Sequence, residues 1–211
     1  MSTTPPGHPG VVYIVDDDDS FLKSMSRLLA ATGYQIKTFE SARKFLGQLV
    51  PEMCGCVVAD LQMPDMDGLE LQSELARTSN PLPVIFLTGQ GDIPSSVKAM
   101  RGGAEDFLTK RAPKDQLLAA VQRAMERDVQ ERRERSRLKS LRGRFDALSE
   151  RELEVLGHVI KGKMNKEIAD DLKINLRTVK LHRTSITRKL EVQSVAELTR
   201  LADEAGLFQK A

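Results

Sequence analysis

Four consecutive aspartates, Asp16 to Asp19, directly follow the apolar stretch VVYIV at residues 11–15. Neighbouring carboxylates repel, and two like charges about 4 Å apart cost roughly 4 kcal/mol at an effective dielectric near 20. Acids crowded at the end of a buried segment therefore predict that a positive group binds there. Carboxylate oxygens are the ligands that hard divalent cations such as Mg²⁺ prefer, so metal binding is the first chemistry we expect.

Three further polar residues stand at the ends of later apolar stretches. Asp60 ends CVVAD, Thr88 ends PVIFLT and Lys110 follows DFLT. If these stretches are strands of one open parallel sheet, their side chains meet Asp16 and Asp17, because ligands bind beyond the carboxyl ends of such strands. The set would combine three carboxylates, a hydroxyl and an ammonium around one Mg²⁺ ion.

The apolar pattern of the first 125 residues predicts the elements that such a sheet needs. Strands are expected at 11–15, 34–39, 56–60, 83–88 and 106–109, with helices at 20–33, 41–49, 68–78, 93–103 and 112–128. Strands separated by helix-length crossovers form a parallel sheet with helices on both faces. The predicted fold of this part is α/β, doubly wound, with the order (βα)5.

Composition and charge divide the chain into parts with different partners. Residues 1–125 contain 15 acidic and 12 basic side chains, whereas residues 161–190 contain three acidic and nine basic ones. No apolar run approaches the roughly 20 residues of a membrane span, and residues 1–10 lack the layout of a secretory signal. We expect no membrane partner and a cytoplasmic location.

The chain after Asp146 shows a helical pattern throughout, with helices expected at 149–161, 165–172, 176–190 and 194–206. Ser149 and Glu152 have the spacing of a capping box, and Asn165 and Asn175 are the expected N-caps of the next two helices. A small all-α domain with a helix-turn-helix that enters the DNA major groove fits this pattern. The alternative is a helical bundle with a solvated charged face.

The expected organisation has four segments. They are a disordered lead-in at 1–10, the α/β domain at 11–125, a helical linker at 126–145 and the all-α domain at 146–211. The linker is predicted to be a solvated, charged spacer that continues the preceding helix. A nucleic-acid contact through its basic excess and a dimer contact through its sparse apolar residues are the alternatives.

The motifs IVDD at 14–17, VVADLQMPDMDG at 57–68, FLTG at 86–89 and DFLTK at 106–110 resemble the receiver domain of bacterial two-component response regulators. The resemblance covers residues 10–125 and implies a flavodoxin-like fold. The stretch TGQGDIP at 88–94 particularly resembles the FixJ group.

This resemblance implies a role for each residue that matches a motif position. Asp60 would accept a phosphoryl group from a sensor histidine kinase. Asp17 and Asp60 would bind Mg²⁺ directly, Asp16 would act through water, and the backbone carbonyl of Gln62 would complete the protein ligands. The remaining roles are charge neutralisation by Lys110, a hydrogen bond to the phosphoryl group from Thr88, and an aromatic switch at Phe107.

Position 111 departs from the family pattern. The family usually has proline after the position of Lys110, often with a cis bond, whereas this chain has Arg111 there. A non-proline cis bond costs about 3–4 kcal/mol, so either the bond is trans or the strain is tolerated.

The segment LSERELEVL, followed by NKEIA and TVKLH, is similar to the LuxR/FixJ/NarL DNA-binding domain over about residues 146–208. By that resemblance Lys180, Leu181 and Thr184 face base edges. Phosphate contacts are implied for Arg177, Arg183, Arg188, Lys166 and Lys163. The helix at 194–206 would be a dimerisation helix, and promoter DNA, a homodimer partner and RNA polymerase are the implied partners.

Together these patterns predict a phosphorylation-dependent transcription regulator that is not a turnover enzyme. The alternative is a constitutive DNA-binding regulator whose receiver is a dimerisation scaffold, for which Arg111 is the hint. A Mg²⁺-dependent phosphatase is a third reading, but it would need an acid where Gln62 stands.

Overall fold

A computed structural model of the 211-residue chain describes residues 10–89 and 93–207. These residues form two compact units, which divide between Arg132 and Arg133. The lead-in expected at 1–10 lies, apart from Gly10, outside the described residues, as does the middle of the stretch at 88–94. Among the described residues no helix is long and apolar enough to cross a membrane.

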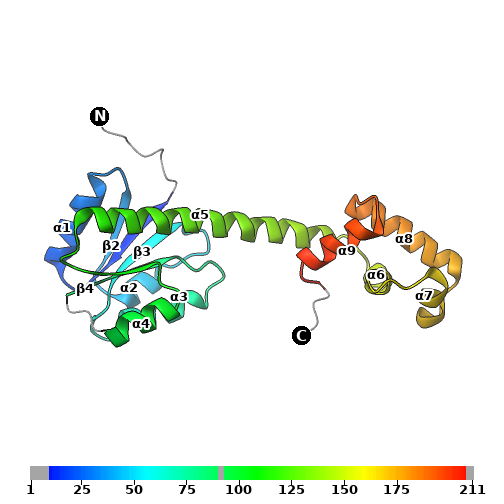
Figure 1. Ribbon diagram of the computed structural model, residues 1–211, viewed down its shortest axis with the longest axis horizontal. Coiled ribbons are helices and arrows are strands. Elements are labelled where there is room, and N and C mark those ends of the chain that lie inside the picture. Colours follow the sequence, from blue (N-terminus) through cyan, green and yellow to red (C-terminus); the bar gives the residue numbers. More distant parts are fainter. Residues whose placement is uncertain (1–9, 90–92, 208–211) are drawn as a thin grey trace. The chain divides into compact units, whose positions relative to one another are not determined.

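A parallel five-stranded sheet with the order β2-β1-β3-β4-β5 forms the centre of the first unit (Figure 1). The strands are β1 (Val11–Val15), β2 (Gln35–Phe39), β3 (Gly55–Asp60), β4 (Val84–Thr88) and β5 (Asp106–Thr109). They match the predicted stretches within one or two residues. The predicted doubly wound α/β fold is confirmed.

Helices cover both faces of this sheet (Figure 1). α1 (Asp19–Ala30) and the first part of α5 (Lys114–Phe145) pack on the face that carries Val12 and Ile14. The opposite face, which carries Tyr13 and Val15, is covered by α2 (Ala42–Leu46), α3 (Gly68–Ala76) and α4 (Ile93–Arg101). Because successive strand residues point to opposite faces, one continuous apolar stretch supplies both layers of the core.

Gly55 begins β3 in a conformation that only glycine adopts without strain. Its φ is +123°, and a Cβ built there would lie 1.9 Å from the carbonyl oxygen of Val11. The close approach lets β3 pair with β1 from its first residue, so the two strands stay in register up to Val15 and Ala59. That register decides where the residues after the two strands meet.

α5 continues without a break from the first unit through the expected linker to Phe145. The predicted helix is present, but it is not solvated at every turn. Asp128 is buried; its carboxylate accepts a hydrogen bond from the Gly55 N–H at 2.9 Å and pairs with Arg132 at 2.8 Å. Leu141 and Phe145 are also buried, in the core of the second unit.

The second unit is helical, as predicted. It contains the last part of α5, α6 (Glu150–Ile160), α7 (Asn165–Leu172), α8 (Leu176–Leu190) and α9 (Val195–Glu204). The capping box of Ser149 and Glu152 is present, and Asn175 caps α8. Val155, Ile168 and Ile186 are among the residues that fill the core between these helices.

Candidate functional site

Three carboxylates gather at the carboxyl edge of the sheet. β1 ends at Val15 and is followed by Asp16 and Asp17, while Asp60 ends the neighbouring strand β3. Carboxylate oxygens of these three aspartates lie within 4.8 Å of one another, with Asp16 and Asp60 buried and Asp17 exposed. The strand ends bring together the acids that the sequence predicts to meet.

Lys110, which follows β5, places its ammonium among these acids. Its Nζ lies 2.6 Å from Oδ2 of Asp16 and 2.9 Å from Oδ2 of Asp60. Burial raises the pKa of Asp16, although the bond from Lys110 opposes that shift. Burial alone would lower the pKa of Lys110, but its bonds to Asp16 and Asp60 outweigh burial and raise it. The ammonium is therefore charged at neutral pH.

Thr88 ends β4 with a fully buried hydroxyl that has no hydrogen-bond partner among the described residues. A buried polar group left unpaired costs about 1–3 kcal/mol. The backbone N–H of Lys110 donates to the carbonyl oxygen of Thr88 at 2.8 Å, which ties the ends of β4 and β5 together. The Thr88 hydroxyl is thus a free hydrogen-bonding group at the same edge as the acids.

The other expected pocket residues lie around this edge. Gln62 is exposed, and its backbone N–H points to Oδ1 of Asp60 at 3.4 Å. Phe107 is half-buried, with its ring centroid 6.2 Å from that of Phe86. An open hollow lined by Asp17 and Gln62 lies beside the cluster.

The loop after β5 accommodates Arg111 without a cis bond. No peptide bond within the described ranges is cis, so the bond that follows Lys110 is trans. The Arg111 side chain is exposed. Of the two possibilities left by the sequence, the structure adopts the unstrained one.

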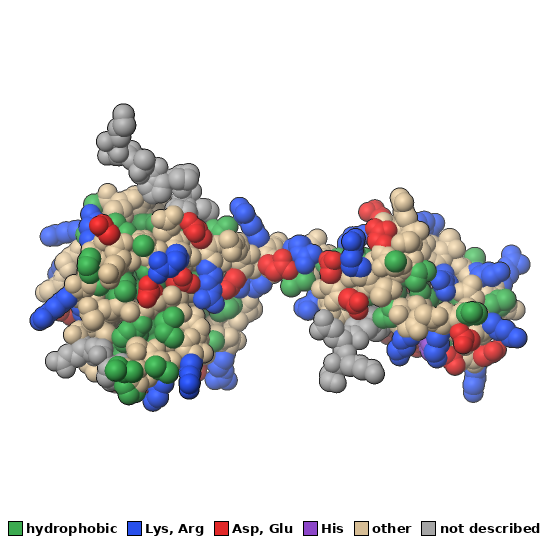
Figure 2. Space-filling model, in the orientation of Figure 1, with side chains coloured by type: hydrophobic (Ala, Val, Ile, Leu, Met, Phe, Trp, Pro, Cys, Tyr) green, Lys and Arg blue, Asp and Glu red, His purple; other side chains and the backbone are tan. Residues whose placement is uncertain are grey.

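α8 presents two different faces in the second unit. Val179, Ile186 and Leu190 are buried as predicted. The exposed residues with expected DNA contacts are Arg177, Lys180, Leu181, Thr184 and Arg188 on α8 and Lys166 on α7. Figure 2 shows Lys and Arg side chains gathered, with some acidic ones among them, at the end of this unit formed by α7 and α8. The pattern is that of a helix with an apolar inner face and a basic outer face.

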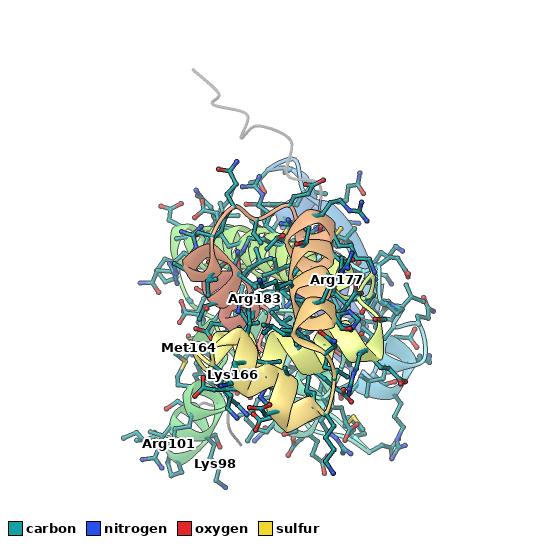
Figure 3. All side chains as sticks on the ribbon, turned by 90° about the vertical axis from the view of Figure 1, so that its right-hand side faces the viewer. Lys98, Arg101, Met164, Lys166, Arg177 and Arg183 are labelled. Carbon is teal, nitrogen blue, oxygen red and sulfur yellow. The ribbon has the colours of Figure 1, made fainter. Side chains whose placement is uncertain are left out.

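Two other residues with expected phosphate contacts are bonded within the protein. Arg183 is half-buried and donates from Nη1 to Oδ1 of Asn165 at 2.8 Å, and Lys163 pairs with Asp171 at 2.5 Å. Figure 3 shows Arg183 and Arg177 on different sides of α8, with Lys166 projecting from α7. Arg183 therefore lies at the margin of the basic face.

The expected N-cap at Asn165 is wrong by one residue. The cap position of α7 is Met164, whose side chain makes no capping bond, and Glu167 accepts from the Met164 N–H at 2.6 Å. The Met164 side chain is 75% exposed (Figure 3). Asn165, as the first helical residue, is left free to accept the bond from Arg183.

The first unit is an α/β domain with an acidic pocket, and the second contains a helix-turn-helix with a basic outer face. This combination defines the class of regulators in which a receiver domain is joined to a DNA-binding domain. The family described as "Response regulator receiver domain" matches residues 12–122, and "Bacterial regulatory proteins, luxR family" matches residues 146–202. The chain belongs to the response regulators that carry a LuxR-type DNA-binding domain, and it is a transcription regulator.

Several curated relatives cover most of the chain. It is 40% identical over 193 residues to the response regulator protein TmoT of Ectopseudomonas mendocina, covering 92% of this chain and 88% of TmoT. It is 38% identical over 195 residues to the transcriptional regulatory protein FixJ of Rhizobium meliloti, covering 92% and 96%.

Solved structures give the same assignment. The response regulator StyR matches with a TM-score of 0.77 at 40% identity, over 92% of this chain and 98% of StyR. Full-length FixJ from B. japonicum matches with a TM-score of 0.57 at 35% identity, over 95% and 99%.

Proposed function

We propose that this chain is a phosphorylation-dependent transcription regulator that receives a phosphoryl group on Asp60 from a sensor histidine kinase. The observation that carries the proposal is the Lys110 ammonium, held 2.9 Å from Asp60 and 2.6 Å from Asp16. Phosphoryl transfer requires mainly positioning and charge neutralisation. A buried nucleophilic carboxylate beside an ammonium and a free hydroxyl supplies both.

The donor set fits a Mg²⁺ ion. Asp16, Asp17 and Asp60 offer hard oxygen ligands close to one another, and Mg²⁺ typically takes one or two carboxylates together with waters and phosphate oxygens. When bound, the ion supplies charge neutralisation for the phosphoryl oxygens. Asp17 and Asp60 would hold it directly, Asp16 through water, and Gln62 through its backbone carbonyl.

The side chains of the pocket have separate roles in the phosphoryl transfer. The Asp60 carboxylate attacks the phosphorus of the kinase's phosphohistidine, and the bond from phosphorus to the histidine nitrogen breaks. Lys110 neutralises charge on the transferring oxygens, and the Thr88 hydroxyl, which is buried without a partner among the described residues, donates to one of them. A rotamer change of Phe107 then accompanies the new Thr88 bond and passes the signal to the surface of the receiver.

The DNA partner is a two-fold promoter site bound by a homodimer, with α8 of each subunit in a major groove. Lys180, Leu181 and Thr184 read base edges, while the surrounding arginines and lysines meet phosphates. Phosphate contacts set the affinity and its salt dependence, and base-edge contacts set the sequence preference. RNA polymerase is the further partner that a promoter-bound regulator would contact.

The direct test is labelling by acetyl phosphate in the presence of Mg²⁺, read by intact mass spectrometry. The wild-type chain should gain one phosphoryl group, and Asp60→Asn should gain none, because the amide is not a nucleophile for phosphorus. The matched control is Asp65→Asn, which changes an exposed acid outside the cluster. Asp65 has φ +67°, a conformation that asparagine tolerates. Equal labelling of Asp60→Asn and Asp65→Asn would contradict the assignment.

A further inference from the structure

Lys110 has a third neighbour that no sequence motif predicts. Its Nζ lies 4.4 Å from the centroid of the Phe21 ring, in addition to its bonds with Asp16 and Asp60. A cation within about 6 Å of an aromatic centroid, over the face of the ring, is attracted by the ring quadrupole. The ammonium is therefore held by two carboxylates and one aromatic face.

The Phe21 ring has a fixed place of its own. Phe21 lies in the first turn of α1, where the Asp18 carboxylate accepts from the backbone N–H groups of Ser20 and Phe21 at 2.9 and 3.2 Å. The half-buried ring packs against the apolar core between α1, α5 and the sheet. Its position thus depends on the cap and the core and does not require Lys110.

The three contacts of Lys110 respond differently to phosphorylation. The bond to Asp60 must change, because a carboxylate oxygen of Asp60 becomes part of the acyl phosphate and the ammonium has to turn to a phosphoryl oxygen. The attraction to the ring has no donor–acceptor pair to break, so it persists during that exchange. Lysine has a flexible four-carbon stem, and without the ring the ammonium could leave Asp60 for solvent.

We propose that Phe21 is a positioning residue for phosphoryl transfer, whose ring keeps the Lys110 ammonium beside Asp60 throughout the reaction. In that reaction the Asp60 oxygen forms a bond to phosphorus while the bond from phosphorus to the donor breaks, so that a histidine nitrogen leaves when the donor is the kinase and acetate leaves when it is acetyl phosphate. This role rests on the proposed function of Asp60.

The first experiment compares initial rates of labelling by acetyl phosphate with Mg²⁺ in three variants of the full chain. Phe21→Leu keeps an apolar side chain but removes the aromatic face, so labelling should slow by roughly three- to tenfold. Phe21→Tyr keeps the face and should stay within about twofold of wild type. The matched control is Tyr34→Leu, which removes a half-buried aromatic next to the same core. Tyr34 directly precedes β2 and so lies at the amino-terminal end of that strand, away from the carboxyl ends where the acids gather. This variant should leave the rate unchanged.

The second measurement separates positioning from general packing. An aromatic face shields the protons beneath it, so the ε-CH₂ proton signals of Lys110 should lie upfield of those of the other lysines. The signals are assigned by their loss in Lys110→Met. Phe21→Leu should move them to the ordinary lysine position, and Phe21→Tyr should keep them shifted.

The outcomes distinguish this inference from the proposed function. If the wild-type chain takes up no phosphoryl group, the proposed function fails and this inference fails with it. If the wild type is labelled but Phe21→Leu is labelled equally fast, only the role of Phe21 is overturned. The same holds if Phe21→Tyr is as slow as Phe21→Leu, or if the Lys110 signals show no upfield shift.

Discussion

At the scale of single residues, the acidic pocket is a balance of opposite charges, two of whose acids are buried. Asp16 and Asp60 are buried, and Lys110 contacts both of them. One ammonium cannot neutralise three carboxylates, and like charges held this close repel. The excess negative charge is the physical reason why a divalent cation and a phosphoryl group fit here together.

Glu152 shows the same kind of balance in the second unit, where it has a structural role. Its carboxylate is buried, pairs with Lys189 at 2.7 Å and accepts from the Ser149 N–H at 2.8 Å. Burial alone would raise the pKa of Glu152. The bonds with Lys189, Ser185 and Ser149 outweigh burial and lower this pKa from 4.5 to about 2.

A pH dependence of stability follows from Glu152. Because its folded pKa is depressed, the unfolded chain takes up the proton first as the pH falls. The stabilisation is present above pH 4.5 and is lost between pH 4.5 and about 2. Glu152→Gln should lower the free energy of unfolding at pH 7 by about 1.5–3 kcal/mol and flatten the dependence in that window.

Urea unfolding followed through the NMR signal of a core methyl group of Ile186 measures this in the second unit alone. Glu154→Gln is the control, because Glu154 is exposed on the same helix and pairs with Arg151 at the surface. A Glu152→Gln variant as stable as this control would contradict the account.

The residues of the acidic pocket could be predicted from the sequence because each one directly follows or ends a strand. Asp60, Thr88 and Lys110 needed only the strand ends and the parallel topology. Phe21 and Asp128 could not be predicted in the same way, because their partners lie far away in the chain and across different elements. Phe21 lies in the first turn of one element and Lys110 follows another, so no spacing in the sequence relates them, and only the folded structure shows that the ring faces the ammonium.

At the scale of elements, α8 combines a core face and a recognition face. The buried stripe of Val179, Ile186 and Leu190 orients the helix, so Lys180 and Leu181 are turned to solvent. The spacing of apolar residues predicted this orientation. The neighbouring N-cap was misplaced because α7 begins without a capping side chain: Met164 stands at the cap position, and its backbone N–H donates to Glu167.

Lys180→Ala should weaken binding to a specific DNA site by about 1–3 kcal/mol, because an exposed base-edge contact is lost. The DNA used is a duplex selected from a random pool by the full chain, and the affinity is measured by fluorescence anisotropy. Lys161→Ala removes the same charge from an exposed position outside the proposed contact set and should change the affinity little. Equal losses in the two variants would mean that only the positive charge matters, and would contradict the base-edge role of Lys180.

α5 is anchored to the receiver by a buried carboxylate. Asp128→Ala should lower the free energy of unfolding of the first unit by about 1–3 kcal/mol, because it leaves the buried N–H of Gly55 without its acceptor. Glu126→Ala, an exposed change on the same helix, should stay within about 0.5 kcal/mol of wild type.

Tyrosine fluorescence during urea unfolding reports this anchor selectively. The chain has two tyrosines and no tryptophan, and both tyrosines, Tyr13 and Tyr34, lie in the first unit. A midpoint for Asp128→Ala equal to that of Glu126→Ala would mean that α5 is not held by this contact. The sequence alone suggested a solvated spacer here. Asp128 stands in a run of charged residues, and nothing in their spacing distinguishes the one that is buried.

At the scale of the whole molecule, the two units have separate cores and different chemistry. The first buries its apolar residues on both faces of a sheet, and the second buries them between helices. The change from alternating βα units to a purely helical pattern made this division predictable from sequence. The proposed coupling between the units is a difference in DNA affinity between the phosphorylated and the unphosphorylated chain. Neither the apolar pattern nor the strand ends contain information about that difference.

The measurement that tests this coupling most directly is the affinity of the full chain for its selected DNA duplex, with and without beryllofluoride and Mg²⁺. Beryllofluoride mimics a phosphoryl group on the acceptor carboxylate. The account predicts that it tightens binding of the wild type by about tenfold, within the usual range of coupling between two sites, and leaves Asp60→Asn unchanged. Equal affinity of the wild type in both conditions would contradict the account and identify a constitutive DNA-binding regulator.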